Sequence, residues 1–329
     1  MRWSEPATLV VLALLAFALS VIGTAWARRH ALRRGMLDRP GERRSHAVPT
    51  PRGGGIGITL AGLLATALLA LRLDPAWWWV AGGLLLVAAA GGWDDHGDAP
   101  PIARLLLHVV AGLLLATSVG LQGGGPWLAA LSCVLAVGLV NVWNFMDGID
   151  GLAASQGALC AAALLLVAGG PVAALAVVVA AACVGFLPFN LPPARIFLGD
   201  VGSGAIGYLV AMLLVFAAMR LPPAQWPLLL LPTLPFLVDA GMTLAWRVAR
   251  GDCWWTPHVQ HLYQRASRRF GHGRVTALYA AWTLVTITVM VGAFGLCEHA
   301  AAAAVGAWLA ATGAWIGLHR RWATEGLGG

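Results

Sequence analysis

The sequence predicts an all-α, polytopic integral membrane protein in which residues 1–329 form a single domain. Of these residues, 59% are hydrophobic and only 11% are charged, whereas about 25% are charged in ordinary soluble domains. Eleven apolar runs are each close to the roughly 20 residues that a helix needs to cross the hydrocarbon layer. We therefore expect eleven transmembrane helices, near residues 7–26, 55–71, 76–93, 105–121, 126–143, 152–168, 171–189, 203–219, 226–246, 275–296 and 300–318.

The first apolar run has one feature of a signal peptide, because Ala25-Trp26-Ala27 fits a small-residue cleavage site. Its apolar core is longer than the roughly 7–15 residues of a signal peptide, and arginines follow it at once. We therefore expect that this run is not cleaved and remains in the protein as a transmembrane helix. Four turns between later runs are short and rich in Trp, Gly and Pro, which is typical of interfacial anchors and connectors. They lie at residues 77–79, 123–127, 169–171 and 222–227.

The arginines predict the orientation of the chain. All 21 basic residues are arginine, and positively charged loops are kept preferentially in the cytoplasm. If the loop after the first run is cytoplasmic, alternation places eighteen arginines inside and leaves only Arg2, Arg72 and Arg220 outside. We therefore expect the N-terminus outside and the C-terminus in the cytoplasm.

The same composition excludes several classes of function. A chain without lysine has no Schiff-base lysine and no Walker-type phosphate lysine. The net charge of +7 is explained by membrane topology, so no nucleic acid is expected as a partner. The five cysteines are scattered and show neither a CxxC motif nor zinc-ligand spacing.

Every polar cluster falls in a loop on the predicted cytoplasmic side. Unrelated turn residues would divide between the two sides of the membrane. A single active site on the cytoplasmic face is therefore the simplest explanation. The clusters lie at residues 45–55, 94–98, 141–151, 190–204 and 251–274.

The cluster at 141–151 carries two carboxylates, Asp147 and Asp150, between two apolar runs. An aspartate at bilayer depth costs about 2.5–3.5 kcal/mol unless it is paired or solvated. Two carboxylates three residues apart repel each other unless a cation lies between them. Oxygen ligands of this kind suit Mg²⁺ or Ca²⁺, so the segment indicates a divalent-metal site. A solvated turn between two helices is the alternative.

Two further acidic motifs each have a functional and a structural interpretation. Asp94, Asp95 and Asp98 form a DDxxD string at the end of the third run, which fits either a metal or phosphate site or a solvated helix end. Asp200 lies among glycines at the start of the eighth run, where free backbone N–H groups favour an anion. A glycine-rich turn is the alternative for Asp200.

His258 and His261 lie three residues apart and are expected to share a helical face. A zinc site would need a third protein ligand, and none falls at a matching spacing. Contacts to phosphate or sugar are therefore expected, helped by the arginines that follow. Asp239, inside the ninth run, is a functional candidate because intramembrane acids usually are. Simple neutralisation by Arg247 is the alternative.

Taken together, these strings resemble the polyprenyl-phosphate N-acetylhexosamine-1-phosphate transferases of glycosyltransferase family 4. This family includes the undecaprenyl-phosphate GlcNAc-1-phosphate transferase and the phospho-MurNAc-pentapeptide transferase. The resemblance covers nearly the whole chain, with five motifs in family order: PTPRGGG at 49–55, DDxxD at 94–98, NxxNxxDGxDGL at 141–152, FLGDxGS at 197–203 and HxxH at 258–261.

The resemblance implies a reaction and its participants. Such an enzyme transfers a sugar 1-phosphate from a UDP-N-acetylhexosamine to undecaprenyl phosphate and releases UMP, with Mg²⁺ or alternatively Mn²⁺ as cofactor. It works at the lipid bilayer of the bacterial inner membrane, and a homodimer is a further expectation. The product would begin a lipid-linked glycan such as O-antigen or capsule.

The resemblance also implies roles for individual residues. Asp200 corresponds to the metal ligand, Phe197 to the ring that stacks on uracil, and Arg52 and Arg265 to substrate-binding residues. The DDxxD pair would act at the lipid phosphate and the next acids at the nucleotide, while the histidines would contact the diphosphate and sugar. These remaining residues are Asp94, Asp95, Asn144, Asp147, Asp150, His258 and His261. No role is implied for Asp239, His46 or Asp98.

One departure from the family pattern reduces the range of donor substrates that we expect. The peptidoglycan branch carries a run of adjacent histidines in the last loop, whereas this chain reads HVQHLYQR at 258–265. The difference favours plain or 6-deoxy N-acetylhexosamine donors over a pentapeptide-bearing donor. The alternatives are the pentapeptide transferase itself, an intramembrane prenyltransferase, or a secondary transporter, although transporter acids usually lie near the membrane midplane in repeated halves.

Overall fold

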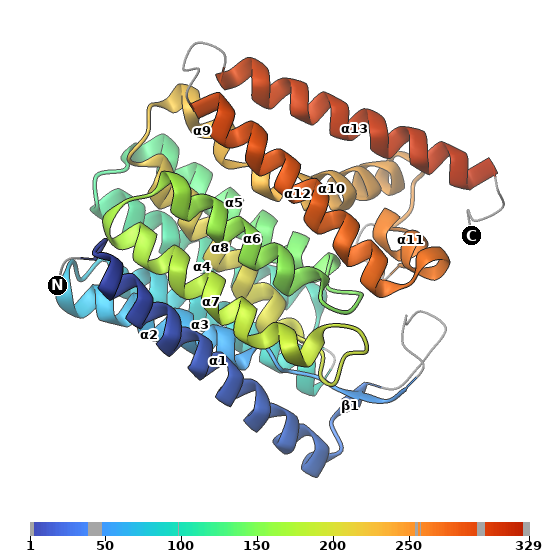
Figure 1. The fold of residues 1–329 in the computed structure, drawn as a ribbon, viewed down its shortest axis with the longest axis horizontal. Helices are drawn as coiled ribbons and strands as arrows, with labels where there is room; N and C mark the ends of the chain where they lie inside the picture. Colours follow the sequence, from blue (N-terminus) through green and yellow to red (C-terminus); the bar gives the residue numbers. More distant parts are fainter. Residues whose placement is uncertain are drawn as a thin grey trace.

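Helices form nearly all of the computed structural model, which describes residues 3–38, 48–97, 99–253, 256, 258–294 and 300–324. The long helices run roughly side by side, and the two termini lie at opposite ends of the bundle (Figure 1). The helices are α1 Pro6–Arg34, α2 Ile56–Arg72, α3 Trp77–His96, α4 Pro101–Leu121, α5 Gly125–Phe145, α6 Leu152–Val167, α7 Gly170–Asn190, α8 Asp200–Ala218, α9 Trp226–Leu229, α10 Leu234–Ala249, α11 Leu262–Phe270, α12 His272–Phe294 and α13 Ala300–Thr324.

The all-α, multi-pass character expected from the composition is confirmed. Among the described residues, eight helical segments are long and apolar enough to cross a membrane. Helices α2 and α6 are apolar but shorter, with 17 and 16 residues, and α3 ends in two aspartates and a histidine. Each of the eleven predicted runs thus corresponds to helical structure. Three of the helices, α2, α3 and α6, are not among the eight that are long and apolar enough to cross a membrane.

Two features of the backbone were not predicted. Residues Leu37–Asp38 (β1) and Thr50–Pro51 (β2) form a small antiparallel sheet. The ninth run is broken, because two short 3-10 turns, Pro223–Gln225 and Leu231–Thr233, flank α9 before α10 begins. Prolines lack the backbone N–H that a continuous helix needs, which explains the break.

Helix α8 forms the centre of the bundle and is buried along its length. It packs against α3 and α5, and glycines allow this close approach. A Cβ atom added at Gly91 of α3 would lie 2.3 Å from the carbonyl oxygen of Asp200, and one at Gly207 would lie 2.4 Å from that of Leu139. Small residues that bring helix backbones together are typical of membrane helix packing. They set the start of α8 directly beside the end of α3.

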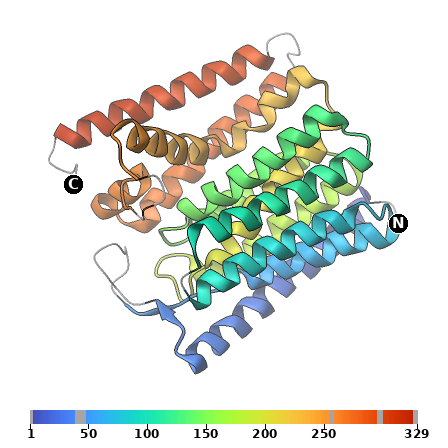
Figure 2. The same cartoon turned by 180° about the vertical axis from the view of Figure 1, so that it is seen from behind.

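Helices α10 to α13 lie along one side of the bundle, with α13 outermost and α1 at the opposite edge (Figures 1 and 2). Helix α11 is short and lies at the same end of the bundle as the β1–β2 sheet (Figure 1). The loops at this end carry the motifs singled out in the sequence.

Candidate functional site

Two distant motifs meet through their backbones at this end of the bundle. The amide of Phe197 donates a hydrogen bond to the carbonyl of Pro51 at 2.8 Å, and the amide of Gly54 donates to the carbonyl of Phe197 at 2.9 Å. Gly199 has a φ of 75°, a conformation that glycine adopts without steric cost. The PTPRGGG and FLGDxGS segments therefore form one unit at the start of α8.

Asp95 holds the start of α8 to the end of α3. Its two carboxylate oxygens accept hydrogen bonds from the backbone amides of Asp200 and Val201, each at 3.1 Å. Such a carboxylate satisfies helix N-terminal N–H groups that otherwise lack partners. Asp95 is 5% exposed and lines one cavity with a small part of its surface, so its geometry is foremost that of a helix cap.

Asp94 and Asp200 share one arginine. Nη1 of Arg104, in the first turn of α4, lies 2.7 Å from Oδ2 of Asp94 and 3.1 Å from Oδ2 of Asp200. All three side chains are partly exposed. The guanidinium carries one positive charge against two carboxylates, so this point of the site keeps a net negative charge when both acids are ionised. Asp98, the third member of the DDxxD string, lies outside the described residues, as does His46.

The two acids of the 141–151 cluster have different surroundings. Asp150 is buried, accepts a hydrogen bond from the amide of Ala194 at 3.0 Å, and lies 3.2 Å from Nδ1 of His272. Asp147 instead faces the open space of the site. Burial and the neighbouring carboxylates, chiefly that of Asp200, raise the pKa of Asp147 well above its usual value.

The histidine pair lies close together but not on a helix as predicted. Helix α11 begins at Leu262, so His261 precedes the helix and His258 lies in the loop before it. The two ring centroids are nevertheless 4.8 Å apart. Burial, helped by His261 and Arg247, lowers the pKa of His258 to about 4, so the ring is neutral near pH 7. The expected shared helical face is wrong, but the proximity is real.

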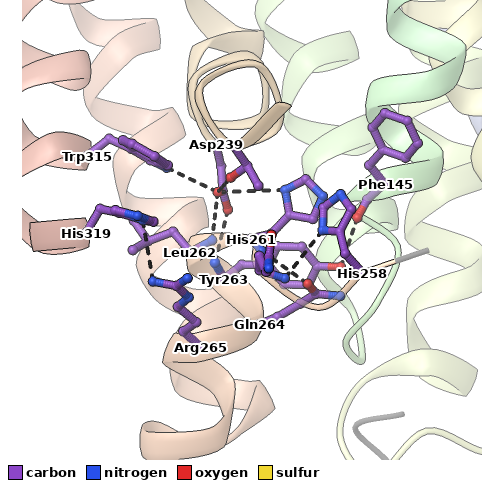
Figure 3. Close-up of polar contacts among 12 residues, drawn as sticks. Phe145, Asp239, His258, His261, Leu262, Tyr263, Gln264, Arg265, Trp315 and His319 are labelled. Atoms are coloured by element: carbon purple, nitrogen blue, oxygen red, sulfur yellow. Dashed lines mark hydrogen bonds and ion pairs between the residues drawn. The ribbon is translucent and has the colours of Figure 1, made fainter. Parts of the chain in front are cut away.

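Arg265 does not reach the site. It is buried, and its Nη1 lies 3.5 Å from Nδ1 of His319 on α13 (Figure 3). It lines neither of the two cavities described below. The adjoining side of α11, which carries Gln264 and Arg268, lines the smaller cavity. Arg265 therefore lies outside both cavities, whereas Arg268, about one turn further along the same helix, lines the smaller one.

The smaller of two neighbouring cavities, which we call the smaller cavity, has a volume of about 370 Å³. Its wall is rich in charged and polar groups and includes one half-buried aromatic ring, that of Phe197. Wall residues from four predicted motifs come together here: Arg52, Asp95, Asp147, Asp150, Phe197 and Asp200.

The larger cavity has a volume of about 820 Å³. It lies between α4, α5 and the segment before α11 that carries His258 and His261, which we call the histidine loop. It is lined by the apolar side chains Ile102, Leu105, Val140 and Phe145. Polar groups gather at one part of its wall, namely Asp94, Arg104, Asn144, His258 and His261. The two cavities share Asp147, Gly148, Asp200 and Gln264, so they adjoin at these acids.

The acids at the shared wall fit a divalent cation that also binds phosphate. In the described part of the chain, no three His, Cys, Asp or Glu side chains are placed to hold a metal by themselves. Mg²⁺ is commonly held by one or two carboxylates together with substrate phosphates. Asp200 and Asp147 supply such oxygens, and the mutual repulsion that raises the pKa of Asp147 would be relieved by a cation.

Several residues of the site were missed in the sequence. Arg104 had been interpreted only as a topological charge, although it links two of the acids. Asn190 accepts a hydrogen bond from the amide of Gly151 and donates one to the carbonyl of Ile196, which joins two motif loops. His272 and Arg268 line the smaller cavity. In the sequence, the only indication that Asn190, Arg268 and His272 belong to the site was that they fall in the polar clusters at 190–204 and 251–274.

Comparison with known proteins gives a consistent picture. The model for Glycosyl transferase family 4 matches residues 77–218. A decaprenyl-phosphate N-acetylglucosaminephosphotransferase of Mycolicibacterium smegmatis is 30% identical over 87% of this chain and 81% of its own length. An undecaprenyl-phosphate alpha-N-acetylglucosaminyl 1-phosphate transferase of Thermotoga maritima is 26% identical over 87% of this chain and 88% of its own.

A relative from the peptidoglycan branch matches a shorter part. A phospho-N-acetylmuramoyl-pentapeptide-transferase of Heliobacterium modesticaldum is 36% identical over 36% of this chain and 40% of its own length. Of these three relatives, the two that align over most of their length are named for N-acetylglucosamine.

Proposed function

The chain belongs to glycosyl transferase family 4, and from this membership we propose that it transfers a sugar 1-phosphate from a UDP-N-acetylhexosamine to a polyprenyl phosphate. UMP is the second product. The acceptor we favour is undecaprenyl phosphate. The single observation that supports this proposal best is the pair of adjoining cavities, one polar and one largely apolar, with carboxylates where they meet.

The two cavities match the two substrates in polarity. A nucleotide is flat at its base and charged at its diphosphate, which suits the smaller cavity with Phe197 as a stacking surface and Arg52 and Arg268 as cations. A polyprenyl phosphate has a hydrocarbon tail and an anionic head, which suits the apolar wall of the larger cavity and Arg104 at its polar end. The reacting phosphates would then meet at Asp147 and Asp200.

The reaction exchanges one phosphoanhydride bond for another. An oxygen of the acceptor phosphate attacks the sugar-linked phosphorus of the donor, and the bond from that phosphorus to the bridging oxygen breaks as UMP leaves. The second pKa of a phosphate monoester is about 6, so near pH 7 the attacking oxygen is already ionised. Asp94 therefore orients the acceptor through Arg104 rather than removing a proton.

We propose Mg²⁺ as the cofactor, with Mn²⁺ as an alternative, held by Asp200 and Asp147. When bound, such an ion neutralises the diphosphate and stabilises the charge that develops on the leaving UMP. The residues of the chain would act around it: Asn144 adjoins the acids from α5, and His258 and His261 face the sugar and diphosphate as neutral hydrogen-bonding rings.

The donor sugar is inferred from the last loop. The sequence HVQHLYQR leaves two spaced histidines that converge on one wall. Two relatives that align over most of this chain are named for N-acetylglucosamine. We therefore propose a plain N-acetylhexosamine or its 6-deoxy derivative, used to begin a cell-envelope glycan such as O-antigen. The match to a pentapeptide transferase makes UDP-MurNAc-pentapeptide the second candidate donor.

We also propose that eleven helices of a single domain cross the bacterial inner membrane, with the N-terminus outside and the site in the cytoplasm. The arginine distribution supports this orientation, and the termini at opposite ends of the bundle agree with an odd number of crossings (Figure 1). A cysteine introduced at Arg268 should react from the cytoplasm and one at Gly124 from the periplasm. Periplasmic labelling at Arg268 would refute the orientation.

UMP release is the direct test of the proposed function. Purified protein in detergent, given undecaprenyl phosphate and a panel of UDP-N-acetylhexosamines, should release UMP only when Mg²⁺ or Mn²⁺ is present. UDP-MurNAc-pentapeptide should give none. Comparable rates with the pentapeptide donor would show that the last loop has been misinterpreted, and light scattering on the same sample tests the expected homodimer.

A further inference from the structure

Asp239 is a fully buried acid that lines neither cavity. Its carboxylate accepts hydrogen bonds from the backbone amides of Leu262 at 2.8 Å and Tyr263 at 3.0 Å, which are the first two residues of α11 (Figure 3). Tyr279 of α12 donates at 2.7 Å and the indole of Trp315 on α13 at 3.3 Å. One carboxylate therefore joins α10 to three other helices, and its strongest geometric link is to the start of α11.

Arg247, on the same helix, holds the loop that precedes α11. Its Nη2 donates hydrogen bonds to the carbonyl of Cys253 at 2.9 Å and to Oγ1 of Thr256 at 3.0 Å, and its Nη1 donates to Gln260 at 2.9 Å. Within the described residues no ion pair links Arg247 to Asp239. The alternative that Arg247 neutralises Asp239 is thus not what the structure has. The two charges instead hold the two ends of the histidine loop.

Tyr263 carries this link on to the acidic loop. Its amide is held by Asp239, and its buried hydroxyl donates a hydrogen bond to the carbonyl of Phe145 at 2.9 Å. Phe145 is the last residue of α5, two residues before Asp147. A Cβ atom at Gly148 would lie 2.2 Å from the Tyr263 hydroxyl, so a larger residue there would displace that hydroxyl. Tyr263 therefore connects Asp239 to the loop between α5 and α6 that carries Asp147, which we call the Asp147 loop.

We propose that Asp239 is a positioning residue that, through Tyr263 and the start of α11, sets the distance between the histidine loop and the Asp147 loop across the larger cavity. His261 immediately precedes the two amides that Asp239 holds, and its ring centroid lies 6.1 Å from that of Phe145. Fixed amides on one side and a fixed Tyr263 hydroxyl on the other leave His261 little freedom to move. The consequence for catalysis rests on the proposed function.

Asp239→Asn is the primary test, because it keeps the size of the side chain but replaces one acceptor oxygen with a donor that faces other donors. Since a misplacement of about 1 Å can cost about 100-fold in rate, we expect kcat to fall by about 10-fold to 100-fold. The KM values of both substrates should change by less than about threefold, because no binding group is removed. Tyr279→Phe, which removes one donor and keeps the ring, provides a milder variant if Asp239→Asn does not fold.

A double-mutant cycle separates positioning from general stabilisation. Tyr263→Phe should lower kcat, and adding it to Asp239→Asn should lower kcat little further, because both act through the same link. Thr283→Val is the matched control: it removes a buried hydrogen bond from α12 to Gln156 of α6, one turn beyond Tyr279, without touching Asp239. Equal kcat losses per folded enzyme in Thr283→Val and Asp239→Asn would overturn the proposal.

A labelling measurement tests the same link without turnover. In a background with the exposed Cys253 changed to serine, a cysteine at Val259 should react with a maleimide several-fold faster when Asp239→Asn is also present. Unchanged labelling together with unchanged kcat would overturn the positioning role. Wild-type protein that releases no UMP would instead refute the proposed transferase function, while the labelling result would still decide whether Asp239 holds the loop.

Discussion

The smaller and larger cavities adjoin each other but are built in different ways. The smaller cavity is formed by loops whose backbones are tied together, as at Pro51 and Phe197, and its wall is mostly polar. The larger cavity is formed by the sides of α4 and α5, and most of its wall is apolar, with charged groups confined to one part. Asp147 and Asp200 belong to both.

This difference shows how one site can serve a water-soluble and a lipid substrate. Loops at a helix-bundle end can present backbone and charged groups to a nucleotide, whereas helix sides at bilayer depth present hydrocarbon. The acids that serve a structural purpose, Asp95, Asp150 and Asp239, are tied to backbone amides. Asp147 and Asp200 instead lie on the wall that the two cavities share.

The largest effect is expected at the shared wall. Asp200→Asn should lower kcat by about 100-fold to 1,000-fold, as loss of an electrostatic stabiliser does, and should abolish Mg²⁺-dependent binding of the UDP-sugar measured by calorimetry. Asp38→Asn, an acid that lines only the smaller cavity, is the control and should retain Mg²⁺-dependent binding. Normal binding of Mg²⁺ and donor by Asp200→Asn would show that Asp200 is not the metal ligand.

The next effect belongs to the larger cavity alone. Asp94→Asn should leave donor binding intact but lower kcat by about 100-fold, because Arg104 loses the carboxylate that orients it. Raising the pH from 7 to 9 should restore less than about twofold, since the acceptor phosphate, with a second pKa of about 6, is already ionised. Full recovery at pH 9 would instead identify Asp94 as a general base.

A smaller effect should be confined to the smaller cavity. Phe197→Leu removes the aromatic surface, and stacking on a base is worth about 1–3 kcal/mol, so the KM for the UDP-sugar should rise by about tenfold. The KM for undecaprenyl phosphate should not change. Phe189→Leu, the same change on α7 away from both cavities, serves as the control. A rise in the acceptor KM would mean that the two cavities are not separate binding regions.

The apolar wall should show the reverse pattern. Leu105→Ala shortens a half-buried side chain that lines the larger cavity. If the tail loses contact equivalent to about one CH₂ group, worth about 0.8 kcal/mol, the KM for undecaprenyl phosphate should rise by about fivefold. The KM for the donor should stay constant. Leu106→Ala changes the adjacent, exposed leucine, which lines neither cavity, and should alter neither value. An equal effect of both substitutions would contradict the assignment of this wall to the lipid tail.

The smallest effect concerns the histidines, which line only the larger cavity. The pKa of His258 is about 4 in the folded protein and about 6.5 when unperturbed, so between these values the unfolded chain binds more protons. The stability contribution is therefore complete above pH 6.5 and is lost as the pH falls toward 4. His258→Gln should flatten the decline in unfolding temperature across this window. Identical slopes would show that burial does not keep His258 neutral.

The coarse fold and the reaction class were available from the sequence. The eleven apolar runs are a local property of the chain, and each of them corresponds to helical structure because a polar backbone in a bilayer must satisfy its own hydrogen bonds. The five ordered motifs likewise named the family before any geometry was known. The break near Leu231–Thr233 and the β1–β2 sheet were missed because apolar content alone does not distinguish a continuous helix from a broken one.

What only the tertiary structure decided is how the polar residues divide their roles. Five acids looked alike in sequence, yet Asp95 and Asp150 hold backbone amides of other segments, Asp94 and Asp200 share Arg104, and Asp147 lies where the two cavities adjoin. Arg268 lines the smaller cavity and Arg265 does not, because α11 turns the side with Gln264 and Arg268 toward it. Asp239 reaches Tyr263 across 24 positions of the chain. These contacts depend on glycines that let α3 and α5 approach α8 and on the angle at which α10 and α11 meet, and neither is encoded in local composition.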